Sequence, residues 1–186
     1  MTRRALIIVD TQPTFCEGGE LPVEGGNRVA ADIAAYLAEH RSEYAAVVTT
    51  QDWHIDPGHH FAAEPDYVDT WPPHGIAGSA SAELHPAIAG LEFDAGVKKG
   101  AYEPAYSGFE GLAGGDRSLE EILRSHGIEA LDVVGIALSH CVKQTALDGA
   151  RLGWPVRVIE RLTVPVTPEQ GVQAVADLKA AGVEIA

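Results

Sequence analysis

Apolar residues along the chain fall into two recurring patterns. Six short, mainly aliphatic runs of the kind that is buried on both faces of a parallel sheet occupy residues 5–9, 45–50, 91–97, 131–134, 156–159 and 183–185. Other stretches have helical spacing, which places Val29, Ile33 and Leu37 on one face, and helices are also expected at 119–126 and 141–153. This alternation predicts an α/β fold of three layers, α/β/α, with a six-stranded, mainly parallel sheet.

Capping residues help to place two of the helices. Asn27 is expected to cap the helix that carries the first apolar stripe. Thr167, Pro168 and Gln170 form a capping box with proline at the first helical position, which predicts that the last helix begins there. Residues 53–90 are expected to be mostly loop, and a loop of this length in a compact domain usually has a function.

Composition narrows the class of protein. A chain of 186 residues that is 46% hydrophobic fits one domain, 1–186, and its net charge of −14 argues against a nucleic-acid or anionic-membrane partner. The apolar run after Arg4 is too short for a signal peptide, and no stretch of about 20 apolar residues exists, so a cytoplasmic protein is expected. Cys16 and Cys141 lie far apart and cannot form a disulfide framework, which suits a reducing compartment.

Three histidines and a carboxylate are concentrated in the segments QDWHIDPGHHF and TWPPHG, which contain Asp52, His54, His60 and His74. Imidazole nitrogen and carboxylate oxygen are ligands that zinc or iron prefers. Asp52 and His54 would point to one face if they lie at a strand end, because side chains alternate along a strand. A single loop histidine is usually solvated, but four potential ligands together predict a metal site.

Three further residues are expected at the carboxyl ends of the strands, where open parallel sheets bind ligands: Asp10, Lys99 and Cys141. Each alone has an ordinary explanation, as a turn residue, a solvated charge or a small buried side chain. Cys141 at a helix start is expected to be stabilised as a thiolate by unpaired N–H groups and the helix dipole. Together the three could act as base, cation and nucleophile.

The chain resembles the nicotinamidases, also called pyrazinamidases, of the isochorismatase-like cysteine hydrolase superfamily, which has a Rossmann-like fold. The matching segments cover most of the chain in order and are ALIIVDTQPTFCEGGELPV, QDWHIDPGHHF, TWPPHG, KKGAYEPAYSGFEG and VVGIALSHCVKQTALDGARLG. The resemblance implies a catalytic triad, namely Asp10, Lys99 and Cys141. It also implies one divalent metal ion, Zn, Fe or Mn, held by Asp52, His54, His60 and His74.

The resemblance implies several details of the pocket as well. A cis peptide is expected between Ile136 and Ala137, with the backbone amides of Ala137 and Cys141 forming an oxyanion hole. The implied substrate contacts are Phe15, Trp71, Tyr106, Ile136 and Ala137. Some positions depart from the family pattern: Pro13 and Thr14 replace a frequent Asn and Asp, and Leu138 and Ser139 replace a common Thr and Asp. His60 is a variable ligand in the family, and the adjacent His59 could compete with it.

The activity implied is hydrolysis of nicotinamide to nicotinate and ammonia in NAD salvage, with pyrazinamide as a further substrate. The partner is then a small molecule, and the chain could be a monomer or a homo-oligomer. A related cysteine amidohydrolase for a carbamoyl or ureido substrate is the closest alternative. A metallohydrolase in which Cys141 is structural is another. A nonenzymatic nucleotide-binding module is disfavoured, because the chain has no GxGxxG after its first strand and no GxxxxGK[ST].

Overall fold

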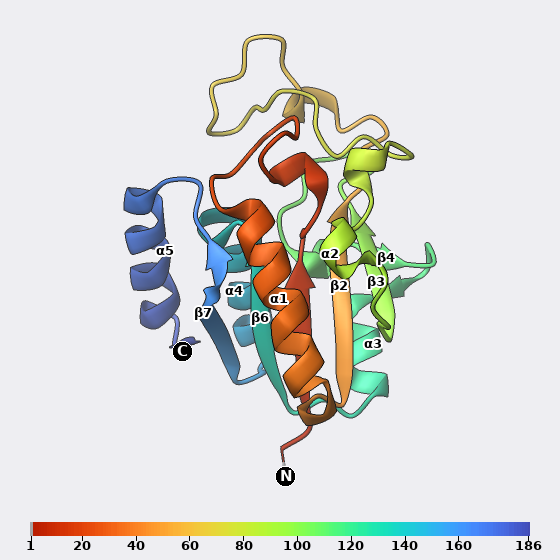
Figure 1. Cartoon of the computed structure of the whole chain (residues 1–186), viewed down its shortest axis with the longest axis vertical. Coiled ribbons are helices and arrows are strands. Elements are labelled where there is room, and N and C mark those ends of the chain that lie inside the picture. The colour runs from red at the N-terminus through yellow and green to blue at the C-terminus, as the bar shows by residue number, and fades with distance from the viewer. Residues whose placement is uncertain (1) are drawn as a thin grey trace.

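The computed structural model describes residues 2–186, which form a central sheet with helices on both faces (Figure 1). The sheet has eight strands in the order β5-β4-β3-β2-β1-β6-β7-β8. Its parallel strands are β1 (Arg4–Val9), β2 (Ala46–Asp52), β3 (Ala95–Lys99), β6 (Ala130–Ile136), β7 (Val156–Val164) and β8 (Glu184–Ile185). These are the six predicted strands, and the expected three-layer α/β/α architecture is confirmed.

The prediction of six strands was wrong in number, because two more strands extend the sheet at one edge. They are β4 (Leu112–Ala113) and β5 (Arg117–Ser118), and both pair antiparallel. A strand of two residues is too short to produce an alternating pattern in the sequence. The third predicted strand also begins later than expected, at Ala95 instead of Leu91.

Helices cover the two faces unequally. One face carries α1 (Gly26–His40) and the short α2 (Pro86–Ala89), and the other carries α3 (Leu119–Ser125), α4 (Lys143–Arg151) and α5 (Pro168–Ala180) (Figure 1). β1 supplies both cores in alternation: Ile7 packs toward α3, α4 and α5, while Leu6 and Ile8 pack toward α1 and α2. Since all three side chains are fully buried, the continuous aliphatic run is explained by burial on both faces.

One predicted cap is confirmed and the other is wrong. The Thr167 hydroxyl accepts the N–H of Gln170 at 3.2 Å and caps α5. Asn27 does not cap α1, because the helix already begins at Gly26, after Gly25 in a left-handed conformation. The Asn27 side chain instead donates to the backbone oxygen of Glu17.

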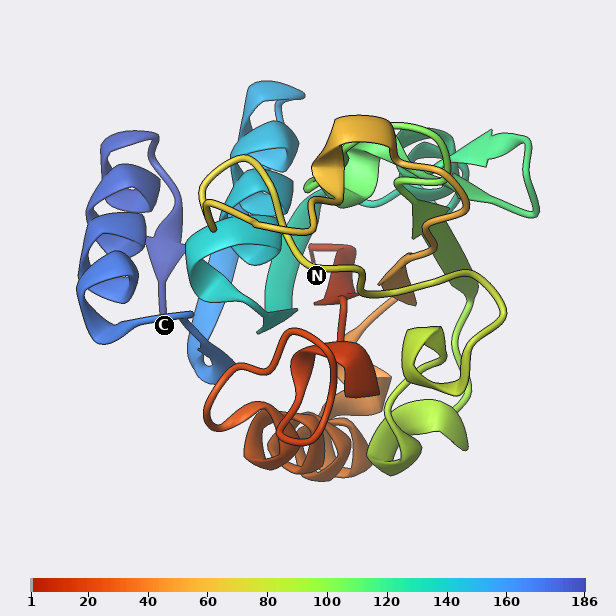
Figure 2. The ribbon, with the colours of Figure 1, turned by 90° about the horizontal axis from the view of Figure 1, so that it is seen from above.

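The segment between β2 and β3 is mostly irregular, as expected, with α2 and short 3-10 turns at Gly58–His60 and Ala80–Ala82. It crosses the carboxyl edge of the sheet, and Figure 2 shows it from above, together with the segment that follows β1. Strands β3, β2, β1 and β6 are parallel neighbours in the sheet, so the residues that follow them lie close together at its carboxyl edge, next to this segment. Among residues 2–186, no helix has the length and apolar character needed to cross a bilayer.

Candidate active site and metal cluster

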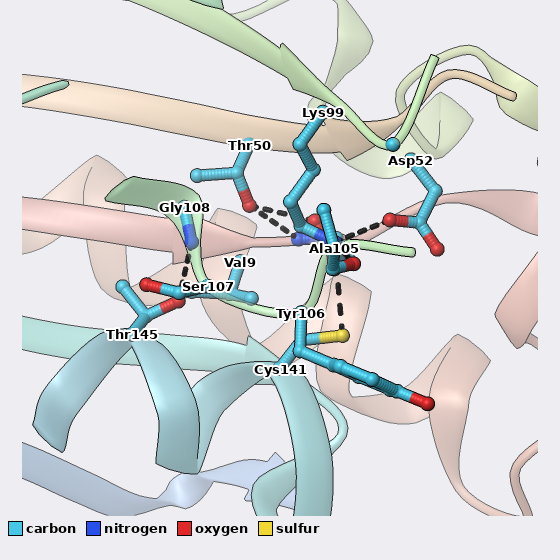
Figure 3. A network of polar contacts seen from close by, with 12 residues as sticks. Val9, Thr50, Asp52, Lys99, Ala105, Tyr106, Ser107, Gly108, Cys141 and Thr145 are labelled. Atoms are coloured by element: carbon cyan, nitrogen blue, oxygen red, sulfur yellow. Dashed lines mark hydrogen bonds and ion pairs between the residues drawn. The ribbon is translucent and has the colours of Figure 1, made fainter. Parts of the chain in front are cut away.

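Asp10, Lys99 and Cys141 come together at the carboxyl edge of the sheet. Asp10 follows β1, Lys99 ends β3, and Cys141 lies in the turn after β6. The Lys99 ammonium nitrogen is 2.9 Å from Asp10 Oδ2 and 3.8 Å from the Cys141 sulfur, and it donates to the Ala105 carbonyl at 3.2 Å. Figure 3 shows the lysine side chain reaching from its strand toward the sulfur. The sequence therefore named three residues that the fold does bring together.

The Asp10 carboxylate is held in a fixed position. Its Oδ1 accepts the Thr50 hydroxyl at 2.6 Å, and the Asp10 N–H donates to the Thr50 carbonyl at 3.1 Å. The backbone of Asp10 has a positive φ of 41°, a conformation in which aspartate is enriched among non-glycine residues. Thr50, which sequence reasoning did not single out, thus orients one oxygen and leaves the other facing Lys99.

Burial dominates the electrostatics of this group. Burial raises the pKa of the Cys141 thiol well above its ordinary value, and although the Lys99 charge opposes this shift, the Asp10 and Asp52 carboxylates add to it. Burial also raises the pKa of Asp10. For Lys99, burial favours the neutral form, but the Asp10 and Asp52 carboxylates outweigh it and raise the pKa well above its ordinary value. The resting state is a protonated thiol beside an ammonium.

Cys141 does lie at a helix start, as expected, but burial, which the sequence does not reveal, raises the pKa of its thiol. Cys141 lies within a single π-helical turn, Leu138–Val142, and α4 begins only at Lys143. Burial of the sulfur outweighs the opposing Lys99 charge in raising its pKa. Formation of the thiolate needs a base, and the carboxylate of Asp10 is the candidate.

Three histidines form a buried cluster beside this group. One ligand nitrogen from each of His54, His60 and His74 lies within 4.8 Å of the other two. His54 Nε2 and His60 Nδ1 are buried and have no hydrogen-bond partner among residues 2–186. Buried polar atoms without partners are costly, and lone pairs converging on one point suit a cation. His59 is exposed on the surface, outside the cluster.

Backbone carbonyls orient two of these rings. His54 Nδ1 donates to the Gly100 carbonyl at 2.6 Å, and His74 Nδ1 donates to the Pro72 carbonyl at 2.8 Å. Each proton is thereby fixed on Nδ1, which leaves Nε2 of both rings as a lone pair directed into the cluster. Hydrogen bonds of this kind are typical behind metal-binding histidines.

Asp52 connects the histidine cluster to the catalytic candidates. Its Oδ2 lies 3.3 Å from His54 Nε2 and 3.5 Å from His74 Nε2, while its Oδ1 accepts a hydrogen bond from Lys99. Burial opposes ionisation of Asp52, but the Lys99 charge lowers its pKa well below the ordinary value. The set of three imidazoles and one carboxylate fits a divalent cation. Sequence reasoning missed the contact with Lys99, although Asp52 and Lys99 are paired residues on β2 and β3.

A cavity of about 460 Å³ opens onto both groups. Its walls include every residue that the resemblance named as a substrate contact: Phe15, Trp71, Tyr106, Ile136 and Ala137. The Trp71 indole donates to the Tyr106 hydroxyl at 2.9 Å, and the expected cis peptide between Ile136 and Ala137 is present. Tyr67 and His140 also line the cavity and were not predicted, because aromatic side chains outside recognisable motifs give no separate signal.

The model of the isochorismatase domain matches residues 4–186. The chain belongs to the isochorismatase family. Among its relatives in this family is the nicotinamidase/pyrazinamidase of Mycobacterium tuberculosis, which is 48% identical over 182 residues, covering 98% of this chain and 97% of the relative.

Solved structures of other proteins share this isochorismatase-family fold along the whole chain. The pyrazinamidase of Pyrococcus horikoshii in complex with zinc has a TM-score of 0.84 and 32% identity, covering 99% of this chain and 98% of that one. PnC1 from L. infantum in complex with nicotinate has a TM-score of 0.87 and 34% identity, covering 100% of this chain and 92% of that one.

Proposed function

We propose that the chain is a nicotinamidase, which hydrolyses nicotinamide to nicotinate and ammonia and also accepts pyrazinamide. The observation that carries the proposal is the buried contact of Lys99 with Asp10 and Cys141 beside a three-histidine cluster, with Cys141, His60 and His74 lining one cavity. The names of the relatives support it, since they include a nicotinamidase/pyrazinamidase and a structure in complex with nicotinate. The first half of the reaction forms a thioester, and the second half hydrolyses it.

In the first half, Asp10 accepts the thiol proton of Cys141, and the sulfur electron pair forms a bond to the carboxamide carbon. The C=O electron pair moves onto oxygen, where the backbone N–H groups of Ala137 and Cys141 donate hydrogen bonds, each typically contributing about 3 kcal/mol. The raised pKa of Asp10 makes its carboxylate a stronger base than an ordinary aspartate, which favours this transfer. Lys99 keeps its charge beside the reacting atoms throughout.

Collapse of the intermediate then releases ammonia. The C=O bond re-forms, the C–N bond breaks, and Asp10 transfers its proton to the departing nitrogen. In the second half, Asp10 accepts a proton from water as the water oxygen adds to the thioester carbon. The C–S bond breaks, the sulfur recovers its proton from Asp10, and nicotinic acid is released. The balance is one amide and one water converted to one acid and one ammonia.

The metal site has a supporting role in this proposal. Asp52, His54, His60 and His74 would hold one divalent cation, Zn, Fe or Mn, and two orphaned imidazole nitrogens support this assignment. A bound cation supplies a Lewis acid that orients the ring nitrogen of the substrate. The flat ring would lie against the cavity walls described above, with Phe15 and Trp71 on its faces and Tyr106 and Ile136 beside it.

Ammonia release from nicotinamide tests the proposal. The wild type should be active, chelation should reduce the rate, and readdition of zinc, iron or manganese should restore it. Cys141→Ala should lose activity, whereas Cys16→Ala, which removes the other buried thiol, should retain it. Full turnover by Cys141→Ala would contradict the thioester route and favour a metallohydrolase. An inactive, folded, metal-loaded wild type would contradict the proposed substrate.

A further inference from the structure

His140 lies on the cavity wall and has no role in the mechanism above. It directly precedes Cys141, and its ring lies 5.4 Å from the Trp71 ring and 6.3 Å from the Tyr106 ring, between centroids. Burial lowers its pKa, and the Lys143 charge adds to this effect. Lys143 itself is paired with Asp177 of α5 at 3.2 Å. The imidazole is therefore neutral near pH 7 and carries one ring proton.

The hydrogen bonds of Ser139 determine which nitrogen carries that proton. The Ser139 oxygen accepts the Val166 N–H at 3.1 Å and lies 2.9 Å from His140 Nδ1. The hydroxyl has a single proton, and within the described chain Nδ1 is the acceptor in reach. Donation of the hydroxyl to Nδ1 gives both groups a partner and places the imidazole proton on Nε2.

The resulting Nε2–H group is a donor on a ring that lines the cavity. It forms no hydrogen bond to any residue from 2 to 186, in contrast to the Nδ1–H groups of His54 and His74, which bind backbone carbonyls. The Tyr106 ring contacts His60 at 5.9 Å on the metal-cluster side and His140 at 6.3 Å. Among the described residues, the His140 ring contacts the rings of Trp71 and Tyr106 and none of the three clustered histidines.

We propose that His140, held as its Nε2–H tautomer by Ser139, is a specificity-determining residue that donates a hydrogen bond to an acceptor on the substrate ring edge turned away from the cluster. The inference rests on the proposed function and deepens it. The two ring nitrogens of pyrazinamide stand opposite each other, so a ring with one nitrogen toward the cluster turns the second away from it. Nicotinamide has a C–H group at the position of this second nitrogen. The pair of Ser139 and His140 therefore favours pyrazinamide over nicotinamide.

Two substitutions of His140 isolate the position of the donor. In His140→Gln the side-chain amide can replace the Nε2–H group, whereas in His140→Asn it can replace only the Nδ1 position. His140→Asn should lower kcat/KM for pyrazinamide about tenfold more than for nicotinamide, as expected for one lost hydrogen bond, while His140→Gln should change this ratio less than about threefold. Ser139→Ala should resemble His140→Asn. Equal losses on both amides would overturn the proposal and leave a structural role only.

A matched control exists elsewhere in the chain. Ser125 and His126 are also adjacent, with the Ser125 hydroxyl 3.4 Å from His126 Nδ1, but they lie at the end of α3 and not in the cavity. Ser125→Ala should leave the ratio for the two amides unchanged. A change as large as that of Ser139→Ala would show that the ratio does not report on the cavity.

Nitrogen NMR of protein with labelled histidine reads the tautomer directly. The expected spectrum has the His140 proton on Nε2, while His126, whose Nδ1 faces the Ile122 carbonyl at 2.9 Å, serves as an Nδ1–H reference. A proton on Nδ1 of His140 would overturn the inference even in an active enzyme. An inactive wild type would instead refute the proposed function. In that case the specificity of His140 is tested by binding, from the ratio of Kd for pyrazinoate to Kd for nicotinate in the two His140 variants.

Discussion

At the scale of single residues, Asp10 has two opposing effects on Cys141. As a base it is needed to remove the thiol proton, but as a neighbouring negative charge it adds to the burial that raises the thiol pKa. Asp10→Asn removes the charge and leaves Lys99 beside the sulfur. This variant should lose amide hydrolysis yet react faster with iodoacetamide at pH 7, because a larger fraction of Cys141 is thiolate.

The alkylation rate is best measured in a Cys16→Ala background, because Cys16 is the other thiol of the chain. Burial raises the pKa of Cys16 to about 11, so its own alkylation would also vary with pH. In the parent protein the rate should rise with pH throughout the neutral range. Slower alkylation of Asp10→Asn would mean that the carboxylate assists this reaction as a base and that its charge matters less than inferred.

Gly100 packs so closely against the three-histidine cluster that no side chain fits at this position. It has a φ of +73°, and a Cβ atom there would lie 2.6 Å from His54 Cε1 and 2.8 Å from Nδ1. Its carbonyl also accepts the His54 proton. Gly100→Ala should therefore displace the imidazole and weaken zinc binding about 10–100-fold, as measured by competition with a chelator. Gly90→Ala, with open space around its Cβ, should bind zinc as the wild type does.

Residue types and their order were enough to name Asp10, Lys99 and Cys141, because each lies at or after the carboxyl end of a strand of the sheet. Two properties could not be read from the sequence. The contact between Asp52 and Lys99 depends on the register of β2 against β3. The raised pKa of Cys141 depends on how completely the fold excludes water from the sulfur, which its position in the sequence does not reveal.

At the scale of structural elements, the segment from His60 to Trp71 is a loop organised by one carboxylate. Asp66 Oδ1 accepts the backbone N–H groups of Val68, Asp69 and Thr70 and the Thr70 hydroxyl. This turn holds Tyr67 at a φ of 59°, with its ring against Trp71 on the cavity wall. Asp66→Ala should raise the rate of chymotrypsin cleavage within the loop about fivefold or more.

Asp69, three residues after Asp66, provides the control substitution. Its backbone N–H donates to Asp66, but its own carboxylate forms no hydrogen bond among the described residues. Asp69→Ala should be cleaved as slowly as the wild type. The N–H donors, Val68 first, hold the pKa of Asp66 far below its ordinary value. Because its pKa is depressed, the Asp66 carboxylate stays ionised and keeps its contacts as pH falls to 4, and it loses them only below that. The hydrogen bonds of the wild-type loop should therefore persist at pH 4. Equal cleavage of both variants would contradict the role of Asp66.

A second element-scale contact joins three strands at the opposite end of the sheet. Asp132 of β6 is fully buried, lies 2.6 Å from Arg4 of β1 and 2.5 Å from Arg157 of β7, and accepts the Tyr44 hydroxyl at 2.8 Å. Asp132→Ala should lower the free energy of unfolding by about 3 kcal/mol, because it leaves two guanidinium groups and a hydroxyl without their partner. Urea unfolding with an unchanged m-value measures this loss.

The exposed pair of Arg28 and Asp32 on α1 is a suitable comparison, at 3.2 Å and mostly solvated. Asp32→Ala should change the free energy of unfolding by about 0.5 kcal/mol or less. Similar losses in Asp32→Ala and Asp132→Ala would show that burial adds nothing to the contact.

The elements that the sequence predicted well are those with a distinct apolar pattern, which is a continuous run in β1 and helical spacing in α1 and α5. It failed for β4 and β5, which have two residues each, and for the π-helical turn before α4. A short strand depends on the neighbour that it pairs with, and the π turn depends on tertiary contacts such as the hydrogen bond from Val166 to Ser139. Neither is encoded in a local apolar pattern.

At the scale of the whole molecule, a cation bound at the three-histidine cluster should contribute to global stability. Its ligands come from a long segment that has little regular structure of its own. Zinc that binds only the folded chain stabilises it by mass action, by about 2.7 kcal/mol at a 100-fold excess over Kd. For a chain of 186 residues this corresponds to a Tm increase of roughly 5–10 °C. Thermal unfolding with and without zinc measures the increase.

Two neighbouring histidines allow this prediction to be tested at the ligands themselves. His60 is buried in the cluster, and burial lowers its pKa to about 4, so its imidazole is neutral and ready to bind a cation. His60→Ala should lose most of the zinc-dependent increase in Tm. His59→Ala should keep it, because His59 is exposed and lies outside the cluster. The opposite result would assign the fourth ligand to His59, and an undiminished increase in both variants would leave His60 out of the metal shell.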